Sequence, residues 1–203
     1  MPRRHGNKEG FCHEGTKSQS FSWCLSVFVA ISFYIRGIMK EKKYILSAEV
    51  ADKKLRRMAL QVAEQNHGAK QLILIGIKTS GSVIAEKISS YLKEVFKGEV
   101  VVLELSMDKK KPAAITLNKK MDFNGKTIVL IDDVANSGRT MLYALKPLLE
   151  QLPEKIQTLA LVERTHKTFP IEVDYIGLSV STTTDEHIYV EVEKGEVAGA
   201  WMD

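Results

Sequence analysis

Two adjacent carboxylates, Asp132 and Asp133, end an apolar run within the stretch VLIDDVANSGRT, which spans residues 129–140. A turn of small polar residues follows them and leads into Arg139 and Thr140. Carboxylates accept hydrogen bonds from neighbouring hydroxyl groups and can hold a hydrated Mg²⁺. A turn of small residues that opens a helix presents unpaired backbone N–H groups, which suit phosphate. Vicinal hydroxyls and one phosphate together describe a ribose 5-phosphate.

A second candidate loop, Lys78–Gly81 with the sequence KTSG, follows the apolar run Gln71–Ile77. Short continuous apolar runs such as this one and Thr127–Asp132 are typical of strands that are buried on both faces. Both loops leave the carboxyl ends of predicted strands and lead into helix N-termini. Ligands bind at this edge of open α/β sheets, so we expect both loops to belong to a ligand site.

Helix and strand patterns alternate from Met39 onward. Ser47 is the predicted N-cap of a helix that runs to about Asn66, with Gly68 as a left-handed C-cap. A second helix is predicted from the KTSG turn to about Lys97. A third is predicted over residues 139–151, where Pro147 should kink or shorten it.

The predicted strands are separated by these helices and by one long polar loop over residues 107–125, which contains a turn at Asn124–Gly125. The strands cover residues 71–77, 99–105, 127–132, 158–164, 173–180 and 187–193. Strands that alternate with helices at this spacing indicate the α/β class, with a parallel twisted sheet flanked by helices.

The first 38 residues differ from the rest of the chain. They contain both cysteines and carry five basic and two acidic residues, which leaves 24 basic and 23 acidic residues in the remainder. Their fifteen-residue apolar run, Phe21–Ile35, is shorter than a membrane span of about 20 residues. It has the length of a signal-peptide core, but no small-residue cleavage site follows. We expect residues 1–38 to be a non-native upstream extension, and residues 39–203 to form one cytoplasmic domain without membrane contact.

The stretch VLIDDVANSGRT resembles the ribose-phosphate signature of the type I phosphoribosyltransferases: an apolar strand, two acids, a short loop, Ser-Gly, a basic residue and Thr. The resemblance implies that family's fold, with a small C-terminal hood. It also implies an enzyme that uses Mg²⁺ to join a nucleobase to phosphoribosyl pyrophosphate (PRPP). Asp132 and Asp133 would contact the ribose hydroxyls and hold the metal, largely through water. With Asn136 they are the implied catalytic residues.

The same resemblance assigns the rest of the site. The implied phosphate loop comprises Ala135, Asn136, Ser137, Gly138, Arg139 and Thr140, which join the two acids in binding PRPP. Pyrophosphate would be bound by Lys78, Thr79, Ser80 and Gly81, a loop whose counterpart in the family often contains a strained peptide, and by Arg164. The implied base-binding residues are Tyr175, Ile176 and Val180, although Tyr175 also fits the core. Lys109–Lys111 form either a lid or a solvated lysine run.

The segments GIKTSG and LVERTHKTFPIEVDYIGLSVSTT narrow the resemblance to the pyrimidine operon attenuation regulators that double as uracil phosphoribosyltransferases. Uracil is therefore the expected base, and a homodimer is the expected assembly. The 6-oxopurine enzymes carry an Asp in place of Asn136 and a Lys in place of Glu163, which counts against a purine. The chain also departs from the regulators, which usually carry Arg in place of Ser80 and Tyr in place of Asn136.

RNA binding is the main alternative function, and a purine-specific phosphoribosyltransferase is the other. The basic residues fall into two clusters, namely Lys53, Lys54, Arg56 and Arg57, and then Arg164, His166 and Lys167. The remainder of the chain, however, is nearly neutral. Release of counterions from RNA would therefore contribute little to the free energy of binding. No aromatic residues interleave with the basic ones to stack on bases. We therefore predict an enzyme first.

Overall fold

The computed structural model describes residues 42–108, 115–183 and 186–203. The elements are β1 (Lys43–Ser47), α2 (Ala48–Gln65), β2 (Gln71–Ile77), α3 (Ser80–Val95), β3 (Glu99–Met107), β4 (Ile115–Leu117), β5 (Thr127–Ala135), α4 (Arg139–Ala144), α5 (Lys146–Leu149), β6 (Lys155–Arg164), β7 (Tyr175–Val180), β8 (Ile188–Glu193) and β9 (Glu196–Met202). No helix in these ranges combines the length and apolar character that a bilayer crossing needs. The predicted leader and the lysine run Lys109–Lys111 lie outside the described residues.

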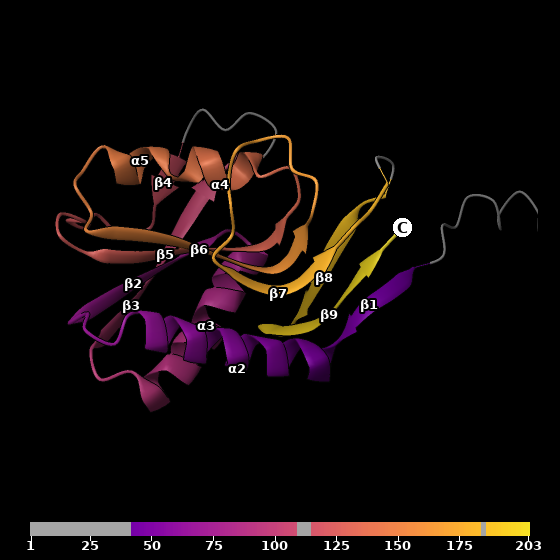
Figure 1. Ribbon diagram of the computed structural model, residues 1–203, viewed down its shortest axis with the longest axis horizontal. Helices are drawn as coiled ribbons and strands as arrows, with labels where there is room; N and C mark the ends of the chain where they lie inside the picture. The colour runs from indigo at the N-terminus through magenta and orange to yellow at the C-terminus, as the bar shows by residue number, and fades with distance from the viewer. Residues whose placement is uncertain (1–41, 109–114, 184–185) are drawn as a thin grey trace, which may run out of the picture. The chain divides into compact units, whose positions relative to one another are not determined.

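The main sheet has the strand order β4-β3-β2-β5-β6-β7. β4 pairs antiparallel with β3, and every other neighbouring pair is parallel. α2 and α3 lie against one face of this sheet, and α4 and α5 lie against the other (Figure 1). The predicted α/β class, with a central parallel sheet flanked by helices, is confirmed.

The side chains of β2 show why the central strands are apolar throughout. Leu72 and Leu74 belong to the core under α2 and α3, whereas Ile73 and Ile75 belong to the core under α4 and α5. Successive side chains of a strand point to opposite faces, so a strand covered on both sides needs an apolar residue at every position. All four side chains are 0% exposed.

A separate antiparallel sheet in the order β1-β9-β8 forms the hood. Its residues Ile188, Ala200 and Met202 are buried in the core of α2 and α3. Tyr189 stacks on Trp201 with ring centroids 4.4 Å apart. The hood therefore combines two C-terminal strands with β1 from the other end of the described chain, and neither β1 nor β9 was predicted.

One helix end differs from the sequence prediction, and one predicted helix break is confirmed. Gly68 does not adopt a left-handed conformation; Asn66 ends α2 instead, and its side-chain amide donates 2.8 Å to the Val62 carbonyl. That bond satisfies one of the acceptors left open at a helix C-terminus. Pro147 splits the predicted helix over residues 139–151 into α4 and α5, as expected for a residue without an N–H group.

The predicted polar loop over residues 107–125 contains a short strand. β4 pairs with the end of β3, and its Ile115 and Leu117 pack on the core under α4 and α5. The partial burial of these two side chains and the pairing with β3 explain why a strand forms in a segment whose sequence is mostly polar. The turn at Asn124–Gly125 is confirmed, with Gly125 at a φ of 64°.

Candidate active site

The two predicted ligand loops meet at one edge of the main sheet. β2 and β5 are adjacent and parallel, so the loops after Ile77 and Ala135 leave the same edge. Gly81 of α3 lies so close to β5 that a Cβ there would be 2.7 Å from the Ile131 carbonyl oxygen and 3.2 Å from Asp132 Cα. A side chain at this position would therefore push the two loops apart.

A cavity of about 330 Å³ lies over the end of β5. One wall is the turn after β5 with the start of α4, and the other is the hood strand β8. The lining residues are Asp132, Asp133, Val134, Ala135, Asn136, Ser137, Gly138, Thr140, Met141, Ile188, Tyr189 and Val190. The cavity thus gathers every residue predicted to bind PRPP except Arg139.

The paired acids lie in different surroundings. Asp132 is 2% exposed, and its Oδ1 accepts a 3.0 Å hydrogen bond from the backbone N–H of Asp133. Asp133 is only partly buried. A hydrogen bond to a carboxylate favours its charged form. This bond therefore offsets part of the cost of ending a buried strand on two like charges.

The loop after β6 holds the turn after β5 in place. The Ser137 carbonyl oxygen accepts hydrogen bonds from the backbone N–H groups of Thr168 at 3.2 Å and Phe169 at 3.0 Å. Gly138 has a φ of 78°, a conformation that glycine adopts without a Cβ clash. A Cβ there would also lie 2.5 Å from Ile171 Cγ2. These bracing residues were missed from the sequence, because no local pattern links them to a turn some thirty positions earlier.

Arg139 belongs to the turn through its backbone. Its N–H group donates 3.3 Å to the Ser137 hydroxyl oxygen. Its side chain is exposed, and the guanidinium carbon lies 5.8 Å from the Tyr143 ring centroid. The cavity lining excludes Arg139, so a phosphate contact from this guanidinium stays a prediction.

The Lys78–Gly81 turn contacts β5 but does not line the cavity. The Lys78–Thr79 peptide bond is cis. The Lys78 N–H group donates 2.9 Å to the Leu105 carbonyl, and its Nζ lies 3.7 Å from Glu104 Oε1. The Lys78 side chain is thus drawn toward β3. The pyrophosphate role of Lys78, Thr79, Ser80 and Gly81 stays a prediction.

Arg164 ends β6 and contacts the turn after β5. Its Nη1 donates 3.1 Å to Asn136 Oδ1, and its Nη2 donates to the Thr183 carbonyl. Its Nε is buried and has no hydrogen-bond partner among the described residues. Two nitrogens of the guanidinium therefore donate to groups of the protein. The predicted pyrophosphate contact of Arg164 stays a prediction.

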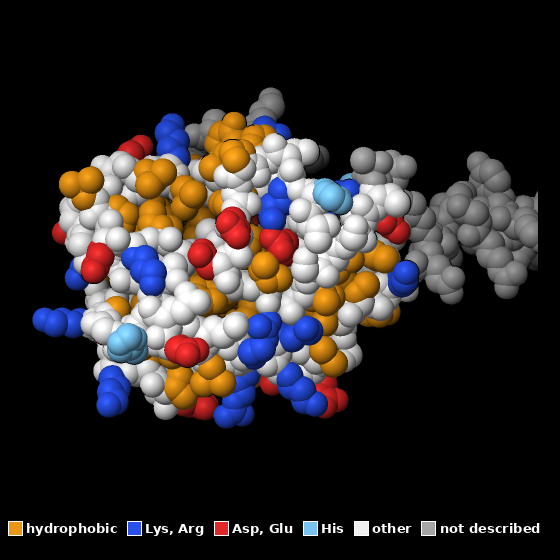
Figure 2. Space-filling model, viewed as in Figure 1, with side chains coloured by type: hydrophobic (Ala, Val, Ile, Leu, Met, Phe, Trp, Pro, Cys, Tyr) orange, Lys and Arg blue, Asp and Glu red, His pale blue; other side chains and the backbone are white. Residues whose placement is uncertain are grey.

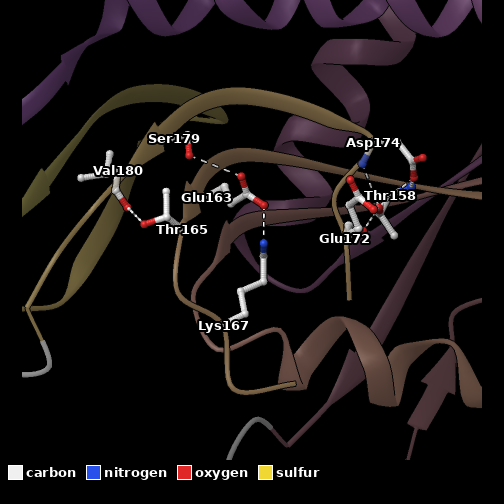
Figure 3. A network of polar contacts seen from close by, with 8 residues as sticks. All are labelled: Thr158, Glu163, Thr165, Lys167, Glu172, Asp174, Ser179 and Val180. Atoms are coloured by element: carbon white, nitrogen blue, oxygen red, sulfur yellow. Dashed lines mark hydrogen bonds and ion pairs between the residues drawn. The ribbon is translucent and has the colours of Figure 1, made fainter. Parts of the chain in front are cut away.

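A polar network joins the carboxyl ends of β6 and β7, as Figure 3 shows. Glu163, which is 8% exposed, forms an ion pair with Lys167 and accepts a 3.4 Å hydrogen bond from the Ser179 hydroxyl. A buried carboxylate is stable only when it is paired and hydrogen-bonded. The sequence grouped Lys167 with a basic cluster, whereas the structure assigns its charge to Glu163.

The predicted base-binding residues do not lie together. Tyr175 is 1% exposed, and its hydroxyl donates 3.0 Å to Gln65 and accepts a 2.7 Å hydrogen bond from Gln157. Burial raises the pKa of this phenol. Tyr175 starts β7 and is therefore at the opposite end of the strand from the cavity. The prediction of a base contact from Tyr175 is wrong, because its ring is buried in the core and its hydroxyl is hydrogen-bonded to the side-chain amides of Gln65 and Gln157.

Ile176 and Val180 have different surroundings. The Ile176 carbonyl accepts a 2.5 Å hydrogen bond from Arg57 of α2, and its side chain packs on the core. The Val180 carbonyl accepts a 3.1 Å hydrogen bond from the Thr165 N–H group. Of the three residues, only Val180 ends its strand at the edge that carries the cavity.

The hood residues Ile188, Tyr189 and Val190 form the wall that the sequence did not identify. Their strand was predicted from its alternating pattern, but nothing in that pattern marks a ligand site. β8 reaches the cavity only because it packs across the end of β5, which is a contact between distant parts of the chain.

Known proteins resemble this chain over most of its length. Residues 43–193 match the phosphoribosyl transferase domain family. Bifunctional protein PyrR of Enterococcus faecalis OG1RF is 32% identical over 170 residues, which cover 79% of this chain and 96% of that protein. Bifunctional protein PyrR of Oceanobacillus iheyensis is 33% identical over 168 residues, which cover 77% and 93%.

Solved structures show the same fold at lower identity. A hypoxanthine-guanine phosphoribosyltransferase from Bacillus anthracis superposes with a TM-score of 0.61 at 19% identity, covering 79% of this chain and 98% of that one. A hypoxanthine phosphoribosyltransferase from Trypanosoma cruzi gives 0.62 at 15% identity, covering 68% and 82%. With the family match over residues 43–193 and relatives above 30% identity, the chain belongs to the phosphoribosyltransferase family.

Proposed function

We propose that this phosphoribosyltransferase transfers the phosphoribosyl group of PRPP to uracil, giving uridine 5′-monophosphate (UMP) and pyrophosphate. The observation that carries the proposal is the cavity in which the paired acids and the small-residue turn face the hood. The resemblance to the regulators that double as uracil enzymes favours uracil, and so do the departures from the 6-oxopurine enzymes at Asn136 and Glu163. The proposal includes the cytoplasm as its location and a homodimer as its assembly.

The proposed roles follow the polarity of the cavity. Asp132 and Asp133 accept hydrogen bonds from the ribose hydroxyls, because carboxylates are acceptors only. The backbone and hydroxyl groups of Ala135–Thr140 donate to the 5-phosphate. Asn136 and the hood wall lie next to these residues and leave room for the base between them. These groups would hold the sugar and the base in one orientation, and positioning of this kind lowers the barrier to bond formation.

Mg²⁺ fits the residues present if the substrate supplies most of its ligands. No group of three or more His, Cys, Asp or Glu side chains within the described residues could hold a metal ion. Mg²⁺ usually keeps several waters and binds one or two carboxylates together with substrate phosphates. Asp132 and Asp133 provide such a pair, largely through water. When bound, the ion would neutralise charge on the departing pyrophosphate.

In the proposed reaction, a ring nitrogen of the base bonds to the ribose anomeric carbon as the bond to pyrophosphate breaks. Positive charge develops on the sugar during this step. The acids at the end of β5 would stabilise that charge in a partly enclosed site, where electrostatic interactions are stronger than in water. β8 would restrict the access of water to the anomeric carbon.

The proposal is tested by incubating the protein with PRPP, Mg²⁺ and a panel of nucleobases while pyrophosphate release is measured. Uracil should support release. If uracil is inert and a purine is active, the substrate is wrong while the family assignment stands. If no base supports release and calorimetry shows no heat with PRPP and Mg²⁺, the enzyme function is wrong.

The contacts of the basic cluster on α2 favour the enzyme over the RNA-binding alternative. Lys53 pairs with Glu49 at 2.6 Å. Lys54 donates 2.9 Å to the Gly177 carbonyl, and Arg57 donates to the Ile176 carbonyl. These three side chains therefore already interact with a carboxylate or carbonyl group of the protein, which leaves them less available to RNA phosphates. Figure 2 shows basic and acidic side chains interspersed on the visible face. RNA binding therefore stays the alternative function.

A further inference from the structure

Asn136 and Arg164 form a contact that selects one orientation of the asparagine amide. Asn136 follows β5 directly and lines the cavity. Arg164 is the last residue of β6, the strand that pairs in parallel with β5. The Arg164 Nη1 group donates 3.1 Å to Asn136 Oδ1. The guanidinium thus lies beside the carboxamide at the edge of the site.

The chemistry of the two side chains decides which end of the amide the guanidinium contacts. Arginine carries five N–H donors and no acceptor. A carboxamide beside it must therefore turn its oxygen toward Arg164, whichever way it is first drawn. The –NH₂ group of Asn136 points away from that contact. It is the end of the side chain that remains for a molecule in the cavity.

A second bond holds the guanidinium in place. Arg164 Nη2 donates to the Thr183 carbonyl. The N–H and hydroxyl groups of Thr183 in turn donate to the Glu186 carboxylate at 2.7 and 3.0 Å. Glu186 lies two residues before β8, which forms the opposite wall of the cavity. Arg164 therefore links the amide of one wall to the segment that leads into the other.

We propose that Arg164 is a positioning residue that fixes Asn136 as a hydrogen-bond donor, so that the site selects a base with a lone-pair acceptor at that point. In uracil this acceptor is one of the two ring carbonyl oxygens. The inference rests on the proposed transfer to a nucleobase. It adds the chemical feature by which the base is recognised.

The donor orientation also has a consequence for the proton of the attacking nitrogen. A carboxamide does not take up a proton at neutral pH, so Asn136 is not the base that removes it. In the proposed order of steps, uracil first loses its ring N–H proton to solvent, and the nitrogen then bonds to the anomeric carbon as pyrophosphate leaves. In wild-type protein, kcat/KM for uracil should therefore rise with pH until uracil itself is deprotonated. Asn136→Asp should change this profile, because it places a titratable acceptor at the same position.

The main experiment compares uracil with 2-pyrimidinone and 4-pyrimidinone, each of which lacks one carbonyl oxygen. In the wild type, one analogue should lose about 5- to 30-fold in kcat/KM, the size expected for one unmet hydrogen bond. Asn136→Ala should remove that discrimination. Arg164→Met should weaken it. Arg164→Lys should restore part of it, since lysine is also a donor only.

Two kinetic outcomes contradict the inference. One is discrimination that survives Asn136→Ala. The other is a large rise in the KM for PRPP in Arg164→Met with unchanged base selectivity, which would assign Arg164 to pyrophosphate instead. If Arg164→Met does not fold by circular dichroism, Arg164→Lys is compared with Asn136→Ala on the two analogues, and discrimination equal to that of the wild type in both variants contradicts the inference.

A binding measurement separates this inference from the proposed function. UMP is titrated into ¹⁵N-labelled protein, and the side-chain amide signal of Asn136 is identified by its loss in Asn136→Ala. A shift of that signal on saturation supports the inference. UMP binding by calorimetry without such a shift overturns the inference and leaves the function standing. No heat with either PRPP or UMP overturns both.

Discussion

The adjacent carboxylates Asp132 and Asp133 at the end of β5 differ in how far they are buried. Asp132 is 2% exposed and accepts a hydrogen bond from the next residue, whereas Asp133 is only partly buried. Both line the cavity. Asp133 is more exposed than Asp132, so its replacement should disturb the core less. It is therefore the better residue in which to test the proposed ribose contact.

Asp133→Ala should lower kcat/KM for PRPP by about 10- to 150-fold, because hydrogen bonds to a charged group are worth about 1.5–3 kcal/mol. Stability should change little, since the substitution also relieves a like-charge pair. Pyrophosphate release and urea unfolding measure the two effects. Glu150→Ala removes an exposed carboxylate from the end of α5 and serves as the control. Full activity in Asp133→Ala would contradict the proposed role.

Substitution of Gly138 tests the backbone of the turn after β5, which is proposed to bind phosphate. Gly138→Ala adds the strain of a positive φ, about 1–2 kcal/mol, and a Cβ placed 2.5 Å from Ile171 Cγ2. Gly195→Ala is the matched control, because Gly195 has a φ of 80° but no atom within 4 Å of a Cβ. Urea unfolding should show a larger loss for Gly138→Ala, by about 1–3 kcal/mol for the overpacked site. Only this variant should weaken PRPP binding. Equal losses in the two variants would show that Ile171 does not restrict the turn.

At the scale of elements, α2, α3 and the hood are joined by a small charged network. The Asp52 carboxylate of α2 accepts a 2.5 Å hydrogen bond from the Tyr91 hydroxyl of α3 and lies 3.3 Å from Lys87 Nζ. Lys87 also pairs with Glu196 of β9 at 2.9 Å. The Tyr91 hydrogen bond, aided by the Lys87 charge, holds the pKa of Asp52 below its usual value. This network connects two helices to the hood.

A lowered pKa means that Asp52 stabilises the fold above its unfolded pKa of about 3.9, and that this contribution is lost as pH falls through the folded pKa. Asp52→Asn should cost about 0.5–1 kcal/mol at pH 7, since the side chain is 49% exposed and solvent screens the pair. The difference from the wild type should shrink below about pH 4. Urea unfolding at several pH values measures it. Glu64→Gln, at an exposed position of the same helix, is the control. A difference that is constant with pH would argue against the network.

The elements predicted from sequence were those with a strong local pattern. The apolar runs of β2 and β5 and the periodicity of α2 were read correctly, because burial on both faces or on one face leaves a clear signature. β1, β4 and β9 were missed. β9 contains Ala198, Gly199 and Ala200, which carry little strand signal, and it is held by pairing to β1 and β8. Such strands depend on partners distant in the sequence, so propensity alone does not identify them.

At the scale of the whole molecule, the hood and the main sheet enclose the candidate site between them. β8 lines the cavity across from the turn after β5. Its Tyr189 lies against Trp201 of β9, and Lys42 Nζ lies 4.7 Å from the Trp201 ring centroid. Binding of a ligand in the cavity should therefore change the surroundings of the stacked Tyr189 and Trp201 rings.

Trp201 provides an optical test of this arrangement. The chain has two tryptophans, Trp23 and Trp201, so Trp23→Phe leaves one reporter. Titration of PRPP with Mg²⁺, or of UMP, should give a saturable change in its emission, because the ligand would contact the wall that carries Tyr189. The midpoint should match that found by calorimetry. Binding without any change in emission would show that the hood does not sense the occupied cavity. Tyr189→Phe retains the stacked ring and should preserve the signal.

The acid pair, the small-residue turn and the apolar strand before them could be read from twelve consecutive residues, since the chemistry and the strand signal are both local there. The second wall of the cavity, the brace from Thr168 and Phe169, and the orientation of Asn136 by Arg164 arise only when β6 and β8 reach the end of β5. The free energy of such contacts is gained only after distant segments have been brought together and the entropy of closing the chain has been overcome. A short stretch of sequence therefore does not show whether the free energy of these contacts exceeds the entropic cost of forming them. The tertiary structure therefore decided which residues complete the site, and it excluded Tyr175 from the base contacts by placing it in the core.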